Sequence, residues 1–120
     1  MAVQLARLAA ENRCRDVVVL DLGGVSPVTD FFVIATGTSS RQMKTVLAKM
    51  SDFLRDHEDV VRLGREGMDS QRWALLDLFD VVVHVFAPEA RSDYALELLW
   101  GDVPKVDWAE GWMPPGDDAE

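Results

Sequence analysis

Apolar positions recur at helical spacing in two segments of the chain. In residues 2–14, Leu5, Leu8 and Ala9 fall at this spacing among alanines and polar residues, which predicts an amphipathic first helix. Residues 40–57 predict a second helix, because these apolar residues share one face of a 3.6-residue repeat: Met43, Val46, Leu47, Met50, Phe53 and Leu54. A helix with one apolar face must cover that face, so we expect the second helix to lie on a sheet.

Four other segments have extended patterns. The predicted strands are the apolar runs VVVLDL (17–22), FFVIAT (31–36), WALLDL (73–78) and VVVHVF (81–86). The connection GGVSPVTD separates the first two runs with glycine and proline, residues that interrupt regular structure.

Two further elements complete the pattern. A short strand is expected at residues 60–63, within a connecting segment that is otherwise polar. A last helix is expected at residues 88–100, where a proline begins it and Gly101 ends it.

The order of these elements predicts an α/β fold with a mixed sheet. A strand, a helix and a strand follow one another in the middle of the chain, which requires at least one parallel crossover. The last two strands are too close together for anything but a hairpin. With 120 residues the chain fits one domain, which we assign to residues 1–107. Residues 108–120 form an acidic, tryptophan-containing tail that we expect to be partly flexible.

The charge balance narrows the classes of partner. Acidic residues outnumber basic ones 21 to 12, for a formal charge of −9, which disfavours direct binding to DNA or RNA and suits a basic protein partner. Solubility alone would explain the charge equally well. No apolar run approaches the roughly 18 residues that span a bilayer, so we expect a cytoplasmic protein without a membrane partner. The single cysteine, Cys14, is expected to be a small apolar residue near a helix.

The segment DFFVIATGTSSRQ (30–42) runs from a predicted strand through a polar turn into a predicted helix. Ser39 and Gln42 have the spacing of a capping box, in which Ser39 accepts from the backbone of Gln42 and the Gln42 side chain returns to the cap. No G-x-x-x-x-G-K-[ST] phosphate loop is present. We favour capping, and anion binding at the same helix start stays open.

Arrangements typical of catalysis find little support. His57 lies near a helix end between two acidic residues, where we expect a solvated side chain rather than a metal ligand. Asp77 and Asp80 are three positions apart across a turn, whereas Asp-x-Asp spacing would point both carboxylates to one face of a strand. We therefore expect no catalytic residue, no metal site and no cofactor.

The last two predicted strands can be aligned by counting outward from a two-residue turn at Phe79 and Asp80. In this register one side is aliphatic and is expected to pack beneath helices: Ala74, Leu76, Leu78, Val81, Val83 and Val85. The opposite side, which we call the outer face, carries Trp73, Leu75, Asp77, Val82, His84 and Phe86.

Two interpretations of the outer face are open. Under a covering helix, His84 and Asp77 would be half-buried polar residues that need partners. An uncovered face would have the composition of an interface, because a large aromatic residue beside a few polar groups concentrates binding energy at protein contacts.

Three blocks of sequence are specific in combination: TGTSSRQ, W-x-LLD followed by DVVVHVF, and PEAR-x-x-Y-x-LE-x-LWGD. Together they resemble the ribosomal silencing factor family, also called the Iojap-related family, from the first helix to about Trp108. The resemblance implies a fold similar to nucleotidyltransferases without their active site. It also implies binding to the large ribosomal subunit through its ribosomal protein numbered fourteen, which blocks subunit joining and lowers translation when nutrients are scarce.

The blocks expected by this resemblance to contact the ribosomal protein contain Trp73, Leu75, Asp77 and Asp80. Ribosomal proteins are typically basic, so the two carboxylates would meet Lys or Arg, while Trp73 would supply desolvated area. Phe79 stands where the family usually has Gly. A type I′ turn requires positive φ there, so Phe79 either changes the turn and the register or adds an apolar contact.

The candidate partner-binding residues are Trp73, Leu75, Asp77, Phe79, Asp80 and His84. Arg41 and Glu89 are secondary candidates, which capping and surface solvation explain about equally well. A rival hypothesis is a nucleotide-binding or nucleotidyltransferase-like enzyme that uses the turn at residues 37–40. A third is a homodimer of the free protein through the outer face.

Overall fold

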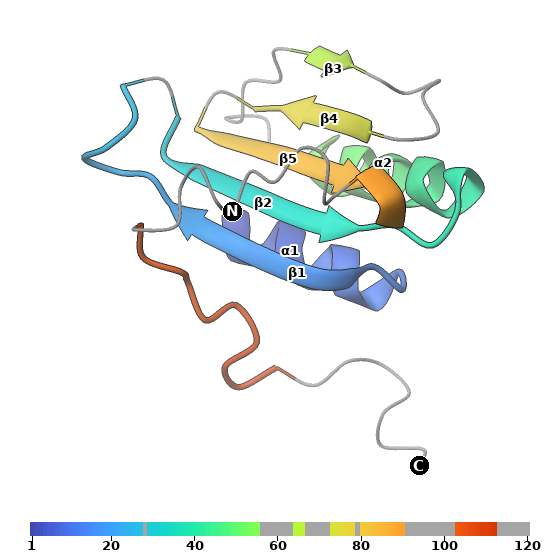
Figure 1. Ribbon diagram of the computed structural model, residues 1–120, viewed down its shortest axis with the longest axis horizontal. Helices are drawn as coiled ribbons and strands as arrows, with labels where there is room; N and C mark the ends of the chain where they lie inside the picture. The colour runs from blue at the N-terminus through green and yellow to red at the C-terminus, as the bar shows by residue number, and fades with distance from the viewer. Residues whose placement is uncertain (28, 56–63, 67–72, 79, 91–102, 113–120) are drawn as a thin grey trace.

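A computed structural model of the chain describes residues 1–27, 29–55, 64–66, 73–78, 80–90 and 103–112 (Figure 1). The elements in these ranges are α1 (Ala2–Glu11), β1 (Arg15–Asp21), β2 (Phe31–Thr36), α2 (Ser40–Arg55), β3 (Gly64–Glu66), β4 (Trp73–Asp77) and β5 (Val81–Phe86). None of the described helices is long and apolar enough to cross a bilayer.

The five strands form one sheet in the order β1-β2-β5-β4-β3. Strands β2 and β5 are parallel, with Phe31 opposite Val81 and Thr36 opposite Phe86. The pairs β1–β2, β3–β4 and β4–β5 are antiparallel. The predicted mixed sheet, the parallel crossover and the closing hairpin are therefore confirmed.

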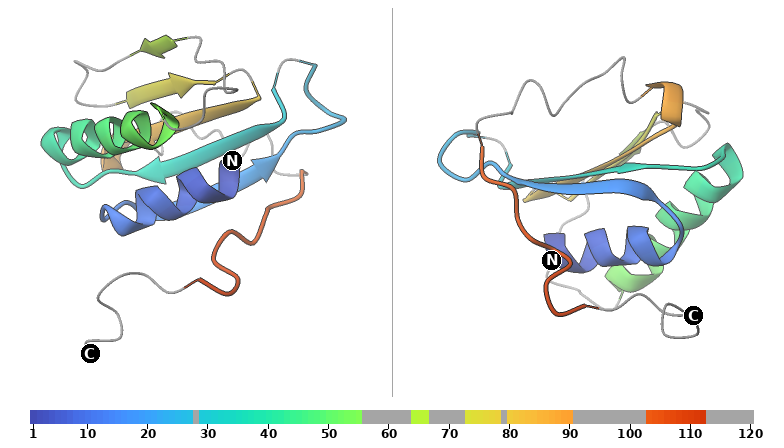
Figure 2. Two further views of the ribbon diagram at one scale, coloured as in Figure 1. Left: turned by 180° about the vertical axis from the view of Figure 1, so that it is seen from behind. Right: turned by 60° about the horizontal axis from the view of Figure 1, so that its bottom comes forward.

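Both described helices lie on the same face of the sheet, as Figure 2 shows from behind and from below. Five of the six apolar residues predicted on one face of α2 are buried there: Met43, Val46, Leu47, Met50 and Leu54. The aliphatic side of the β4–β5 hairpin is buried as well, with no residue more than 3% exposed: Ala74, Leu76, Leu78, Val81, Val83 and Val85. Burial of each larger side chain contributes roughly 1.5–3 kcal/mol, so this layer supplies much of the core.

Helix α1 ends at Glu11, three residues before the predicted end. Arg13 takes the left-handed conformation, with φ 73°. Its N–H donates to the carbonyl of Ala10, and the N–H of Cys14 donates to the carbonyl of Ala9. This pair of bonds is a Schellman ending, which usually has glycine where this chain has Arg13. No glycine marks this position in the sequence, which explains why the predicted end of the helix is wrong.

Residues 104–108 lie beside the outer edge of β1 (Figure 1). Lys105 forms an antiparallel bridge with Leu20, and the N–H of Val106 donates to the carbonyl of Val19 over 2.9 Å. The indole of Trp108 then donates to the carbonyl of Val17 over 2.9 Å. The segment therefore covers part of an edge strand.

Some predictions fall outside the described residues. These are the short strand at 60–63, the turn residue Phe79, His57 and all but the first three residues of the last helix. Apart from α1, the ends of the other predicted elements that the structure describes differ by up to two residues. Strand β1 begins two residues early, β4 ends one residue early, and α2 is described to Arg55.

Candidate partner-binding face

The register of the β4–β5 hairpin places the candidate residues on one face of the sheet. Trp73 lies opposite Phe86, Leu75 opposite His84, and Asp77 opposite Val82. The N–H of Leu78 donates to the carbonyl of Val81 over 2.9 Å, so these two residues close the hairpin. Every pair obtained by counting from the turn is confirmed.

Exposure differs along the outer face. Trp73, Leu75 and Asp77 are half-buried, and Asp80 at the hairpin end is exposed. On the neighbouring strand, His84 is 4% exposed and Phe86 is 1% exposed. Val82 of β5 is half-buried as well, so the surface that a partner can cover consists of the three β4 residues and Val82.

The indole of Trp73 is held by its neighbours on β5. Its Nε1–H donates to Nδ1 of His84 over 3.2 Å. The Trp73 ring stacks on His84, with centroids 5.8 Å apart, and on Phe86, with centroids 5.5 Å apart. Phe32 of β2 meets the imidazole of His84 edge-on, and the two ring centroids lie 4.7 Å apart. Four aromatic side chains from three strands therefore form one cluster.

The imidazole of His84 is neutral at pH 7. Burial lowers its pKa from 6.5 to about 4, and the nearby carboxylate of Asp77 opposes this change only in part. Because an indole only donates, Nδ1 must be the acceptor and the proton of the neutral ring lies on Nε2. Nε2 is buried without a hydrogen-bond partner.

The backbone at Asp80 is fixed by the segment before β2. The carbonyl of Asp80 accepts from the hydroxyl of Thr29 over 2.8 Å, from the N–H of Asp30 over 2.9 Å and from the N–H of Phe31 over 3.0 Å. Thr29 is itself buried. The exposed carboxylate of Asp80 thus projects from a rigid position at the end of the sheet.

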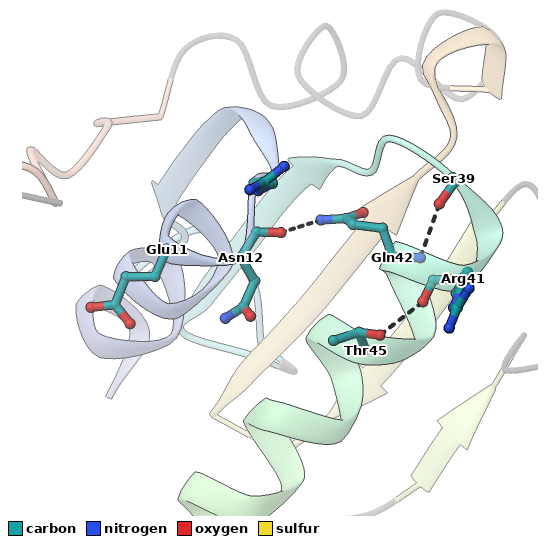
Figure 3. Close-up of a pocket in the computed structure, with 7 residues that line it drawn as sticks. Glu11, Asn12, Ser39, Arg41, Gln42 and Thr45 are labelled. Atoms are coloured by element: carbon teal, nitrogen blue, oxygen red, sulfur yellow. Dashed lines mark hydrogen bonds between the residues drawn. The ribbon is translucent and has the colours of Figure 1, made fainter. Parts of the chain in front are cut away.

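The turn between β2 and α2 is organised by its own side chains (Figure 3). The Oγ of Ser39 accepts from the N–H of Gln42 over 3.0 Å, as the capping box predicts. The predicted return bond to Ser39 is wrong, because Oε1 of Gln42 accepts from the N–H of Thr38 instead, over 3.0 Å. The Gln42 side chain is drawn away from the cap because its Nε2 donates to the carbonyl of Asn12 at the end of α1.

The glycine of this turn also has a structural reason. Gly37 is buried, and a Cβ at this position would collide with the side chain of Met43. Two donors of the turn are already used by Ser39 and Gln42. These contacts favour capping over phosphate binding.

A surface hollow of about 350 Å³ lies between the end of α1 and the start of α2 (Figure 3). It is lined by Glu11, Asn12, Arg13, Ser39, Arg41, Gln42 and Thr45. The secondary candidate Arg41 lies here, one residue into α2, and its side chain is exposed. Across the described part of the chain, no three His, Cys, Asp or Glu side chains are grouped as metal ligands.

Comparison with known proteins identifies the family. A family model described as "Ribosomal silencing factor during starvation" matches residues 1–119. The chain belongs to this family. The protein "Ribosomal silencing factor RsfS" of Bacillus subtilis is 42% identical over 97 residues, which are 81% of each chain.

Two further matches are a mouse protein and a solved bacterial structure. "Mitochondrial assembly of ribosomal large subunit protein 1" of Mus musculus is 35% identical over 100 residues, which are 80% of this chain and 43% of that protein. A crystal structure of a Chromobacterium violaceum protein matches with a TM-score of 0.75, at 34% identity and over 83% of each chain. Ribosomal silencing factors are regulators rather than enzymes, so family membership agrees with the expected lack of catalysis.

Sequence reasoning missed two residues of this silencing factor that shape the candidate face. Phe32 contacts His84 from β2, and Thr29 holds the carbonyl of Asp80. A parallel crossover was predicted without naming the two strands that pair, and a long crossover sets no register that can be counted from the sequence. Thr29 carries no local signal, since its partner is 51 positions away.

Proposed function

We propose that the protein binds the large ribosomal subunit through its ribosomal protein numbered fourteen and sterically blocks joining of the small subunit. This represses translation under nutrient limitation, and we propose the cytoplasm as its place of action. Support for the class of function comes from the family description and from relatives named as silencing factors. The name of the mouse relative refers to the large ribosomal subunit.

The observation that carries the proposal is the half-buried strip on β4. Trp73, Leu75 and Asp77 occupy alternate positions of one strand and share one face. At about 3.3 Å per residue, the strip is about 13 Å long. An indole, an alkyl side chain and a carboxylate in one line offer a partner both apolar area and a charge.

The charge of the strip fits a basic partner. The chain carries a formal charge of −9, and the exposed carboxylate of Asp80 extends the strip at the hairpin end. An exposed carboxylate at the rim of an interface acts mainly on the rate of encounter. Asp77, which is half-buried, would be covered by the partner and would then need a Lys or Arg opposite it.

The remaining candidate residues would lie at the margins of the same binding surface. Arg41 follows β2 and Glu89 follows β5, and both side chains are exposed at the sheet end opposite Asp80. Trp73 lies at that same end, because it is paired with Phe86. We retain Phe79 as a partner contact on the sequence argument, since it adjoins Asp80.

The decisive experiment measures subunit joining by sedimentation of purified subunits. Saturating wild-type protein is expected to keep the subunits apart and to sediment with the large one. Trp73→Ala should weaken binding to the large subunit by about 2 kcal/mol or more, roughly 30-fold, because it removes the aromatic anchor.

The matched control is Trp112→Ala, which makes the same chemical change on the half-buried C-terminal segment. We expect this variant to block joining as the wild type does. Normal joining at saturating wild-type protein would contradict the proposal. A Trp73→Ala chain that is unfolded by circular dichroism would assign the indole to structure instead.

A further inference from the structure

We propose that His84 is a positioning residue for the Trp73 indole, and that it prepares this side chain for the partner without touching the partner. The inference rests on the proposed function, because it deepens the role of the same face. Its evidence is the hydrogen bond between the two side chains and the aromatic cluster around them.

The geometry fixes the indole from two directions. The bond from Nε1–H to Nδ1 of His84 is 3.2 Å long, and the two rings lie within 19° of parallel. Phe86 lies within 20° of the indole plane and within 4° of the imidazole plane. Phe32 meets the imidazole edge-on, at 72°. The ring that holds the indole is thus itself held by β2 and β5.

Burial separates the roles of the two residues. Trp73 is half-buried and retains surface for a partner, whereas His84 is 4% exposed. His84 therefore has almost no surface to offer in a direct contact. An aliphatic residue would fill the same space without leaving the polar atom Nε2 unpaired in the interior. What the imidazole supplies and an aliphatic side chain does not is the acceptor at Nδ1.

This acceptor matters for binding because it removes two costs. A partner need not provide an acceptor for the indole N–H, since His84 already provides one. The indole also loses less rotational freedom on binding when its orientation is set beforehand. A Trp73 indole without its hydrogen bond to His84 would bind the same partner more weakly.

The test compares two substitutions that differ in the acceptor. His84→Phe keeps an aromatic ring and removes the acceptor, while His84→Asn places an amide oxygen near the position of Nδ1. The first readout is the nuclear magnetic resonance signal of the Trp73 indole N–H in the free protein, assigned among the four tryptophans with Trp73→Ala. The second is affinity for purified large ribosomal subunits from the organism that encodes the chain.

We expect His84→Phe to shift the indole signal, to speed its exchange with water and to weaken binding about tenfold, the effect of one hydrogen bond. His84→Asn should restore the signal and bring affinity within about threefold of the wild type. Val83→Ala, the neighbouring position that points into the core, is the control for loss of stability alone. It should leave both readouts unchanged.

Three results would overturn the inference. They are wild-type affinity and an unchanged indole signal in His84→Phe, a His84→Asn variant as weak as His84→Phe, and an equal loss of affinity in Val83→Ala. A failure of the proposed function looks different. In that case Trp73→Ala binds normally, while the indole signal of the free protein still reports whether His84 holds Trp73.

Discussion

At the scale of single residues, His84 has an energetic role beyond its contact with Trp73. Its pKa is lowered from 6.5 to about 4 by burial, so the folded state keeps the ring neutral where the unfolded chain protonates it. The unfolded state then binds more protons, and stability falls as the pH falls. This loss begins near pH 6.5 and is complete near pH 4.

We predict a change in stability between pH 6.5 and about pH 4. The difference in pKa corresponds to roughly 3 kcal/mol of the free energy of unfolding, present above pH 6.5 and lost by about pH 4. Urea unfolding at pH 7.5 and pH 5 checks it. His84→Phe has no titrating ring, so its stability should change less between these two pH values. Equal changes in the two proteins would show that other groups are responsible.

At the scale of elements, the start of α2 combines a local helix cap with a hydrogen bond to the end of α1. Ser39 caps the helix, and the side chain of Gln42 joins it to the end of α1 through the carbonyl of Asn12. Gln42 also donates to the sulfur of the buried Cys14 over 3.4 Å. One amide therefore connects the two helices that lie on the same face of the sheet.

Removing the cap should cost stability without affecting ribosome binding. Ser39→Ala is expected to lower the free energy of unfolding by about 1 kcal/mol, because the N–H of Gln42 loses its acceptor. Ser40→Ala makes the same change one residue later and should lie within about 0.5 kcal/mol of the wild type. Thermal unfolding distinguishes the two. A Ser39→Ala variant that fails to associate with large subunits would indicate a direct role for this turn.

The sequence was informative wherever spacing alone determines structure. The β4–β5 register follows from counting across a short turn, and each predicted pair was found. Spacing could not predict how exposed each residue of the outer face is. His84 and Trp73 share this face, yet His84 is buried and Trp73 is half-buried. The Gln42 bond to Asn12 joins groups 30 positions apart, for which no local pattern exists.

At the scale of the whole molecule, charge and sheet edges limit how copies associate. The outer edge of β1 is partly covered by residues 104–106, which use its backbone groups. Pairing between two copies at this part of β1 is therefore disfavoured. The half-buried strip of Trp73, Leu75 and Asp77 is the surface that a second copy would cover.

We expect the free protein to form a homodimer through the outer face, in competition with the ribosome. Light scattering should give twice the mass of one chain at high concentration, and Trp73→Ala should shift the protein toward the monomer because it removes apolar contact area. Large subunits added to the dimer should capture single chains. A dimer that binds the subunit intact would place the two surfaces apart.

The contacts of Arg7 join the beginning of the chain to its end. Its guanidinium donates to the carbonyl of Trp108 over 2.8 Å and to the carbonyl of Glu110 over 3.0 Å. A chain shortened before residue 108 would leave Arg7 without these acceptors and the carbonyl of Val17 without its indole donor. Unsatisfied groups on a strand margin are templates for aggregation. Deletions that look harmless by sequence position would thus make the protein more prone to aggregate.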